Sequence, residues 1–235
     1  DVIAINMPWL GECVANNVAQ PLTQHLKASS INPMDFHPAI WATGSWDKTH
    51  YGIPIYCTIE ALSLRKDLFE ARKIPYPTNF EKVIHAAKAL HNPKRGMHGV
   101  VWNAARGMPV SHSFMFFMGD CGSPVISIPT PRLHLDYSRI KDEAMRPQIL
   151  SEAGRQTLKY MHELLAYSPP DILSIDWNRA LEYFMGGHAA MIYCWTMRAA
   201  RFVEWYGIDA RYRACDLEPP PEPGELDPLP NRTPN

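Results

Sequence analysis

The sequence predicts an α/β fold, because short apolar segments typical of buried strands alternate with segments of helical periodicity. Three segments carry this prediction: the apolar run 98–102, the amphipathic stretch 78–90 and the apolar run 189–193. The 235 residues are 46% hydrophobic and 20% charged, which supplies enough apolar side chains for a globular core. Since strands and helices alternate, we expect much of the sheet to be parallel.

The first part of the chain combines extended segments with one helix. Residues 2–5 are all apolar and predict a buried strand, and residues 12–19 predict a helix. Residues 51–56 and 61–64 predict two extended segments. Between them stands Glu60, a carboxylate inside an otherwise apolar stretch.

The stretch 78–90 gives the clearest helix signal. Thr78 and Glu81 match a capping box, in which each side chain satisfies the other's free backbone amide. Asn92-Pro93 predicts the end of the helix, and residues 98–102 then predict a buried strand. Apolar residues with helical spacing predict one buried face: Phe80, Val83, Ile84, Ala87 and Leu90.

Two more helices and a strand follow in the second half. Residues 152–165 predict a helix, and Asp176 predicts the cap of a second helix that Gly186-Gly187 ends. Residues 189–193 predict a short buried strand, and the aromatic run 114–118 is more typical of a core than of a site. Three apolar residues are expected on the buried face of the first of these helices: Leu158, Met161 and Leu165.

Composition excludes several classes of protein. A formal net charge of −1 argues against nucleic-acid binding, which needs clustered Lys and Arg to neutralise phosphates. No apolar run approaches the roughly 20 residues that span a bilayer. The chain shows no export signal, so we expect either a cytosolic protein or a sequence that begins after such a signal.

The chain also lacks the motifs of common enzymes and metal sites. It has no H-E-x-x-H, G-x-G-x-x-G, Walker-type or G-x-S-x-G motif, so we expect no enzyme, no cofactor and no metal. The seven prolines and several acids between Asp216 and Asn235 predict a disordered tail. The cysteines are scattered without metal spacing, which predicts free thiols and leaves one disulfide open: Cys13, Cys57, Cys121, Cys194 and Cys215.

Several segments together resemble the extracellular solute-binding proteins of family 1, the group that includes maltose-binding protein. The most specific is the run 51–69, Y-G-I-P-I-Y-C-T-I-E-A-L-S-L-R-K-D-L-F, followed by a proline-rich connector and a capped helix. A second is F-M-G-G-H-A-A-M at 184–191, with Trp195 after it. A third is the apolar start of the chain through Trp9-Leu10.

The resemblance implies a fold of the periplasmic-binding-protein type II, with two α/β lobes around a ligand cleft. It assigns residues 1–60 to part of the first lobe and the crossover, and residues 61–205 mostly to the second lobe with a return segment. Residues 206–235 are then a divergent proline-rich tail. Because members of the family are much longer, we expect this chain to be an incomplete internal fragment.

The function implied by the resemblance is capture of a small hydroxylated solute, such as a sugar or polyol, for an ABC importer. The expected partner is the permease in the inner membrane, the expected location is periplasmic or extracellular, and the protein is expected to be a monomer. A sensor or accessory protein that presents its liganded state to a receptor is an alternative. A carbohydrate-active enzyme is a weaker alternative.

Three residues lead the predicted binding site. Trp9 follows a predicted strand end, where ligand crevices form in α/β folds. Trp195 matches the family's stacking aromatic, and Glu60 matches an acid that contacts ligand in the maltose-binding branch. The competing interpretations are a packing aromatic for Trp9 and a structural ion pair for Glu60.

Further contacts are predicted after the strand at 98–102. The family places ligand contacts of the second lobe there, which indicates Asn103, Arg106 and Met108. Arg106 is otherwise a solvated loop residue. Tyr56 and His112 are weaker candidates in the same set.

Overall fold

The computed structural model describes residues 1–127 and 145–198, which belong to two compact units. Unit 1 comprises residues 1–58 with the described residues of 123–151, and unit 2 comprises residues 59–122 with 152–198. The predicted tail at 206–235 and the end of the predicted return segment lie outside the described residues.

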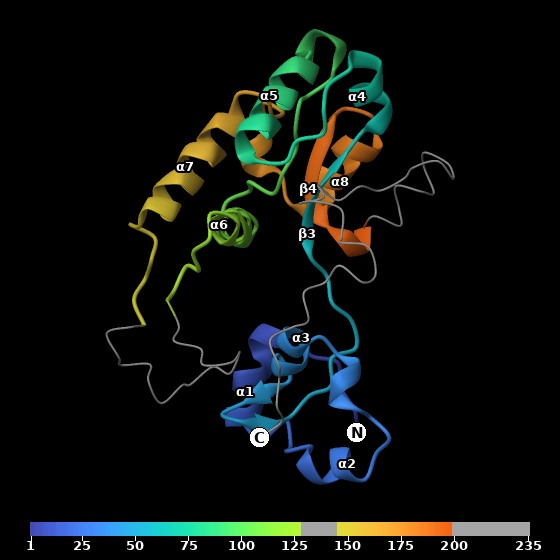
Figure 1. Ribbon diagram of the computed structural model, residues 1–235, viewed down its shortest axis with the longest axis vertical. Helices are drawn as coiled ribbons and strands as arrows, with labels where there is room; N and C mark the ends of the chain where they lie inside the picture. Colours follow the sequence, from blue (N-terminus) through green and yellow to red (C-terminus); the bar gives the residue numbers. More distant parts are fainter. Residues whose placement is uncertain (128–144, 199–235) are drawn as a thin grey trace, which may run out of the picture. The chain divides into compact units, whose positions relative to one another are not determined.

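Unit 1 is built from short helices and one hairpin (Figure 1). The hairpin turns through Asp47 and Lys48, whose φ angles of 44° and 64° fit the two-residue turn that matches strand twist. Its elements are α1 (Leu10–Ala15), α2 (Thr23–Lys27), α3 (Pro38–Ala42), β1 (Ser45–Trp46) and β2 (Thr49–His50).

Two predictions for unit 1 are wrong in detail. Residues 2–5 form no strand, and Val2 is fully exposed, because they have no pairing partner among the described residues. The helix predicted at 12–19 is α1, which begins at Leu10 and ends at Ala15. It ends early because Asn17 adopts a left-handed conformation at φ 55°.

Unit 2 is built around the antiparallel pair of β3 (Glu60–Leu64) and β4 (Met191–Trp195). Residues 98 and 101 form parallel bridges to Ala189 and Ile192. In the described residues, parallel pairing is thus confined to these two bridges. The sequence predicted a larger share of parallel sheet. Helices complete the unit: α4 (Lys66–Arg72), α5 (Phe80–Leu90), α6 (Met108–Asp120), α7 (Glu152–Leu165) and α8 (Trp177–Met185).

Of the helices in unit 2, α5, α7 and α8 were predicted, with two corrections, whereas α4 and α6 were not predicted. Asn79, not Thr78, caps α5, because its side chain accepts from the backbone N–H of Lys82 at 2.9 Å. In α7, Leu158 is 54% exposed although it was expected on the buried face. Met161, also expected on that face, is buried as predicted, and the other buried residues of α7 are Gly154, Thr157, Tyr160 and Leu164.

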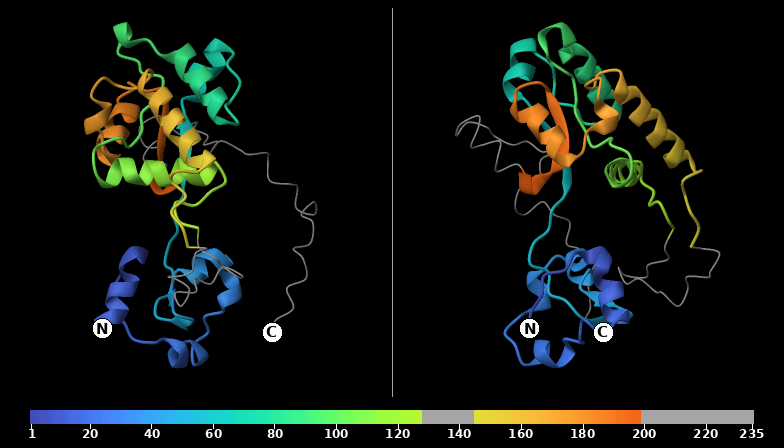
Figure 2. Two further views of the ribbon diagram at one scale, coloured as in Figure 1. Left: turned by 90° about the vertical axis from the view of Figure 1, so that its left-hand side faces the viewer. Right: turned by 180° about the vertical axis from the view of Figure 1, so that it is seen from behind.

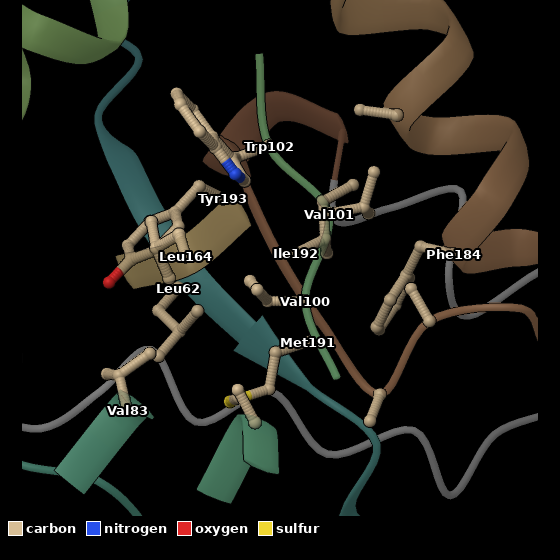
Figure 3. Close-up of a cluster of buried hydrophobic side chains, with 14 of the residues drawn as sticks. Leu62, Val83, Val100, Val101, Trp102, Leu164, Phe184, Met191, Ile192 and Tyr193 are labelled. Atoms are coloured by element: carbon tan, nitrogen blue, oxygen red, sulfur yellow. The ribbon is translucent and has the colours of Figure 1, made fainter. Parts of the chain in front are cut away.

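The core of unit 2 lies between these helices and the strands. α6 packs against α7, and α8 packs against β4 (Figures 1 and 2). From the predicted core run in α6, Phe117 and Met118 are fully buried, whereas Met115 is 51% exposed. Figure 3 shows core side chains from β3, β4, the 100–102 segment, α5, α7 and α8: Leu62, Met191, Ile192, Tyr193, Val100, Val101, Trp102, Val83, Leu164 and Phe184.

Candidate functional site

Three segments of unit 2 bring polar and aromatic residues to one end of its sheet. Glu60 opens β3 and lies directly opposite Trp195, which ends β4. Asn103 follows the 98–101 segment, which runs parallel to β4. Side chains beyond the carboxyl ends of parallel segments are where α/β folds form binding sites. The strand register therefore positions Glu60, Asn103 and Trp195 together.

Glu60 is buried and holds one hydrogen bond. Its side chain is 3% exposed, and its Oε1 accepts from Nδ2 of Asn103 at 3.2 Å. The carbonyl of Asn103 in turn accepts from the Ser113 hydroxyl at 2.9 Å, which ties this corner to α6. The second carboxyl oxygen of Glu60 has no hydrogen-bond partner.

His112 lies on α6 between the carboxyl group and an indole. Its Nδ1 is 3.8 Å from Oε2 of Glu60, and its Nε2 is 3.4 Å from Nε1 of Trp195. An indole nitrogen can only donate, so Nε2 of His112 must accept. The neutral imidazole therefore carries its proton on Nδ1, the nitrogen that faces Glu60.

Two tryptophans form the apolar part of the cluster. The rings of Trp177 and Trp195 stack with centroids 5.3 Å apart at 24°, and His112 meets Trp195 edge-on at 5.6 Å. Arg198 lies 5.4 Å from the Trp195 ring centroid, a cation–π contact. Its guanidinium also donates to the carbonyl of Trp177 at 2.7 Å and to the Asn178 side chain at 3.0 Å.

Burial dominates the electrostatics of the cluster. Burial raises the pKa of the Glu60 carboxyl to about 7, while the Arg198 charge and the Asn103 hydrogen bond act in the opposite direction. Burial also lowers the pKa of His112. The thiol of Cys194, next to Trp195 in β4, has its pKa raised to about 12 by burial and by Glu60. Near neutral pH, both His112 and Cys194 are therefore uncharged.

Four buried polar atoms of the cluster lack hydrogen-bond partners among the residues that the structure describes. They include two acceptors and two donors, contributed by β3, the 98–103 segment, α6 and α8. Buried polar groups in folded proteins are nearly always satisfied, so these four neighbouring atoms are candidates for contact with a bound molecule. The atoms are Oε2 of Glu60, Oδ1 of Asn103, Nδ1 of His112 and Nε1 of Trp177.

The structure gathers half of the residues predicted for the site. Glu60, Asn103, His112 and Trp195 lie in this cluster, linked by the contacts above. Arg106 is exposed in the loop before α6, and Met108, the first residue of α6, is 75% exposed.

The other two predicted residues belong to unit 1. Trp9 is 59% exposed and Tyr56 is 69% exposed. The cluster described above lies in unit 2, so neither residue is part of it.

Two members of the cluster were not predicted as site residues. Trp177 opens α8, directly after the capping residue Asp176. Its position directly after Asp176 was the available signal, because the first residue of a capped helix is displaced from the helix's buried middle. The cap itself is confirmed: Asp176 accepts from the backbone N–H groups of Asn178 and Arg179. Arg198 had no signal in the sequence.

Two further observations concern the kind of site. Within residues 1–127 and 145–198, no group of three or more His, Cys, Asp or Glu side chains is arranged to hold a metal ion. In the same ranges, no helix is long and apolar enough to cross a membrane.

Comparison with known sequences gives the family. The sequence model of the bacterial extracellular solute-binding proteins matches residues 1–210. The chain belongs to this family, which confirms the resemblance carried by residues 51–69 and 184–191. Proteins of this family are solute-binding proteins and not enzymes. A search of curated protein sequences found no match.

Solved structures with the same fold are ABC-transporter solute-binding proteins. One from Agrobacterium radiobacter K84, in complex with ribitol, has a TM-score of 0.68 at 26% identity and covers 84% of this chain. One from Agrobacterium vitis S4, with bound D-mannitol, has a TM-score of 0.64 at 19% identity and covers 85%. One from Thermotoga lettingae TMO, bound with α-D-tagatose, has a TM-score of 0.69 at 18% identity and covers 83%.

These likenesses confirm the predicted periplasmic-binding-protein fold. This chain spans 47%, 45% and 47% of the lengths of those three proteins, so it matches about half of each.

Proposed function

We propose that this chain is part of a substrate-binding protein that captures a small hydroxylated solute, a sugar or polyol, for an ABC importer. The protein acts outside the cytoplasmic membrane, in the periplasm or at the cell surface, and delivers its solute to a membrane permease. It binds the solute and releases it unchanged.

The observation that carries this proposal is the group of four polar atoms without hydrogen-bond partners, which lie in the same cluster as the indoles of Trp177 and Trp195. Each hydroxyl of a sugar or polyol both donates and accepts, so it can satisfy the carboxyl and amide oxygens as well as the imidazole and indole N–H groups. Indoles supply apolar contact to the C–H groups of the same molecule. A neutral solute also suits a site whose acid is close to half protonated at neutral pH.

The solutes of the related structures are of this chemical class. Ribitol and D-mannitol are linear polyols and α-D-tagatose is a ketose, and each is bound by a protein of the same fold. These ligands belong to those proteins. Together with the four unmet atoms, they support a polyol or monosaccharide as the solute for this chain.

The cluster has enough binding energy for a micromolar solute. Such an affinity needs about 8 kcal/mol. Contact with two indoles contributes about 2 kcal/mol each by area burial, roughly half of the total. One hydrogen bond to the Glu60 carboxylate contributes about 1.5–3 kcal/mol, and hydrogen bonds to the neutral Asn103, His112 and Trp177 contribute about 0.5–1.5 kcal/mol each, which supplies the remainder. For Trp9, Tyr56, Arg106 and Met108, contact with the solute stays a prediction.

A thermal-shift screen of the 235-residue chain tests the proposal. Ribitol, D-mannitol, D-tagatose and maltose are the first solutes, because a ligand at about 100 times its Kd adds roughly 2.7 kcal/mol to stability. Chromatography of the solute after incubation should recover it unchanged. Turnover of any of them, or no stabilisation by any member of a wider sugar and polyol panel, would contradict the proposal.

Replacing Trp195 with Ala tests the site directly. We expect the affinity for the best solute to fall by about 2–3 kcal/mol, roughly 30–150-fold, because the indole contact and the link to His112 are lost. Isothermal titration calorimetry measures this, and far-UV circular dichroism checks that the variant is folded. Met197→Ala is the matched control, since Met197 lies two residues on and is 56% exposed. Unchanged affinity in folded Trp195→Ala protein would remove Trp195 from the site.

A further inference from the structure

Two of the unmet atoms face each other across a short gap. Oε2 of Glu60 and Nδ1 of His112 are 3.8 Å apart, which is too long for a direct hydrogen bond. Both atoms are buried and neither has another partner. A single oxygen atom between them could lie within hydrogen-bond distance of both, as a bridging water does at other polar gaps.

The donor and acceptor roles at this gap are set by Trp195. Its indole N–H donates a hydrogen bond to Nε2 of His112. The proton of the neutral imidazole is therefore on Nδ1, which faces Oε2 of Glu60. Protonating Nε2 as well would place two N–H groups against each other. The contact therefore keeps His112 neutral as well as fixing its tautomer. The gap thus has a donor on the imidazole side and a carboxyl oxygen on the other.

We propose that one hydroxyl of the bound solute bridges this gap, accepting from Nδ1 of His112 and donating to Oε2 of Glu60, and that Glu60 is a carboxylate in the complex. This inference rests on the proposed function and adds the regulation of the same site by pH. The hydroxyl must both donate and accept, because the imidazole offers a proton and the carboxylate can only receive one. An ether or fluorine at the same position could accept but not donate.

Proton release accompanies binding in this arrangement. The free protein holds Glu60 with a pKa of about 7, so a fraction of molecules is protonated at neutral pH. A hydroxyl that donates to the carboxylate stabilises the ionised form and lowers its pKa. The proton that leaves Glu60 goes to the solvent. Binding of a neutral, non-titrating solute therefore releases a proton.

The groups around Glu60 leave it as the titrating member of the cluster. From α6, His112 faces it with a pKa lowered by burial, and from β4 the Cys194 thiol has a pKa of about 12. The Arg198 charge acts on Glu60, and the Asn103 amide does not titrate. Between pH 6 and 8, the changing charge of the cluster is that of Glu60.

The expected size follows from the pKa of the free protein. If the complex holds Glu60 fully ionised, about 0.8 proton is released per solute at pH 6.5 and about 0.1 at pH 8. The dissociation constant should be about tenfold larger at pH 6 than at pH 8. A solute bound without contact to Glu60 would show neither effect.

Calorimetry in pairs of buffers measures the released proton on the unmodified chain. The best solute of the ribitol, D-mannitol, D-tagatose and maltose set is titrated at pH 6.5 in phosphate and in imidazole, whose ionisation enthalpies differ. The slope of the observed enthalpy against ionisation enthalpy gives the number of protons. Tight binding with a slope of zero at pH 6.5, or equal affinity at pH 6 and 8, overturns the inference while the proposed function stands. No binding at either pH overturns the proposed function itself.

Matched variants identify the groups. Glu60→Gln keeps an acceptor for Asn103 but cannot ionise, so its solute affinity should be independent of pH and its proton release zero. Glu81→Gln, at an exposed position on α5, should behave as the unmodified chain. Proton release that persists in Glu60→Gln would assign the proton to another group and overturn the inference.

The imidazole side of the gap has its own pair of variants. His112→Asn keeps an N–H donor near the position of Nδ1, whereas His112→Gln places its amide nearer the position of Nε2. We expect the first to retain at least about five times the affinity of the second at pH 8. Equal affinities in two folded proteins would remove the His112 donor from the bridge.

Discussion

Two aromatic clusters in unit 2 share α6 and β4 but differ in how their polar atoms are satisfied. The core cluster contains Trp102 and Phe117, and the site cluster contains His112, Trp177 and Trp195. In the core, the indole N–H of Trp102 donates to the Ser168 hydroxyl at 3.1 Å. In the site, the indole N–H of Trp177 is also buried, but it has no partner among the described residues.

We propose that this difference separates a structural cluster from a binding cluster. An unmet buried polar group costs about 1–3 kcal/mol, so a purely structural cluster gains by pairing such groups internally, as Trp102 and Ser168 do. The site retains four unmet atoms, a cost that solute hydroxyls would offset on binding. Substitutions in the core should therefore lower stability, and substitutions in the site should lower affinity.

Phe117→Ala in the core should give the largest effect on stability. The side chain is fully buried and packs edge-on against Trp102, so we expect the free energy of unfolding to fall by about 3–5 kcal/mol. Urea denaturation followed by circular dichroism measures it. Met115→Ala, on the exposed side of α6, should change stability by no more than about 0.5 kcal/mol. A similar loss for both would contradict the assignment of Phe117 to the core.

Comparing Glu60→Gln with the unmodified chain should show how the contribution of Glu60 to the free energy of unfolding depends on pH. The pKa of Glu60 rises from 4.5 to about 7 on folding, so the folded state holds the proton more tightly between these values. This contribution to stability is fully present below about pH 4.5 and is lost as pH rises through 7, a change on the order of 3 kcal/mol. The stability of Glu60→Gln relative to the unmodified chain should therefore rise by that amount between pH 4.5 and 8. A pH-independent difference between the two proteins would contradict a raised pKa.

The sequence predicted most of unit 2 because its elements have strong local signals. The apolar spacing of 80–90 corresponds to the buried face of α5, and the apolar run 189–193 overlaps β4. The strand predicted at 2–5 is wrong because apolar content indicates burial only where a partner exists for pairing. Local pattern alone does not supply that partner.

The candidate site was predictable where chemistry coincides with family motifs. Glu60, Asn103 and Trp195 were proposed from such matches and His112 as a weaker candidate, and the strand register Glu60↔Trp195 brings two of them together. Their contact with a solute stays a prediction. Trp177 was missed because its membership depends on the ring stacking with Trp195, a contact 18 positions away in the chain. No periodicity encodes that contact.

Ser168→Ala tests the hydrogen bond between Trp102 and Ser168 in the core cluster. It leaves the buried N–H of Trp102 without its acceptor, and we expect a loss of about 1–3 kcal/mol in the free energy of unfolding. Adding Trp102→Phe removes the N–H that has lost its acceptor. The effects of the two changes on stability should therefore be strongly non-additive in a double-mutant cycle. Solute affinity of the folded variants should stay within about twofold. Additive losses would mean that the hydrogen bond contributes little.

Trp177→Phe is the matching change on the site side and should have the smallest effect on stability. The ring that stacks on Trp195 is kept, while the N–H that has no internal partner is removed. No hydrogen bond within the protein is lost, so the free energy of unfolding should stay within about 0.5 kcal/mol or rise slightly. Solute affinity should fall by about 1 kcal/mol, roughly fivefold, because one donor to the solute is gone. If Trp177→Phe lost stability as Ser168→Ala does, the indole N–H of Trp177 would be a structural group, and the contrast between the two clusters would fail.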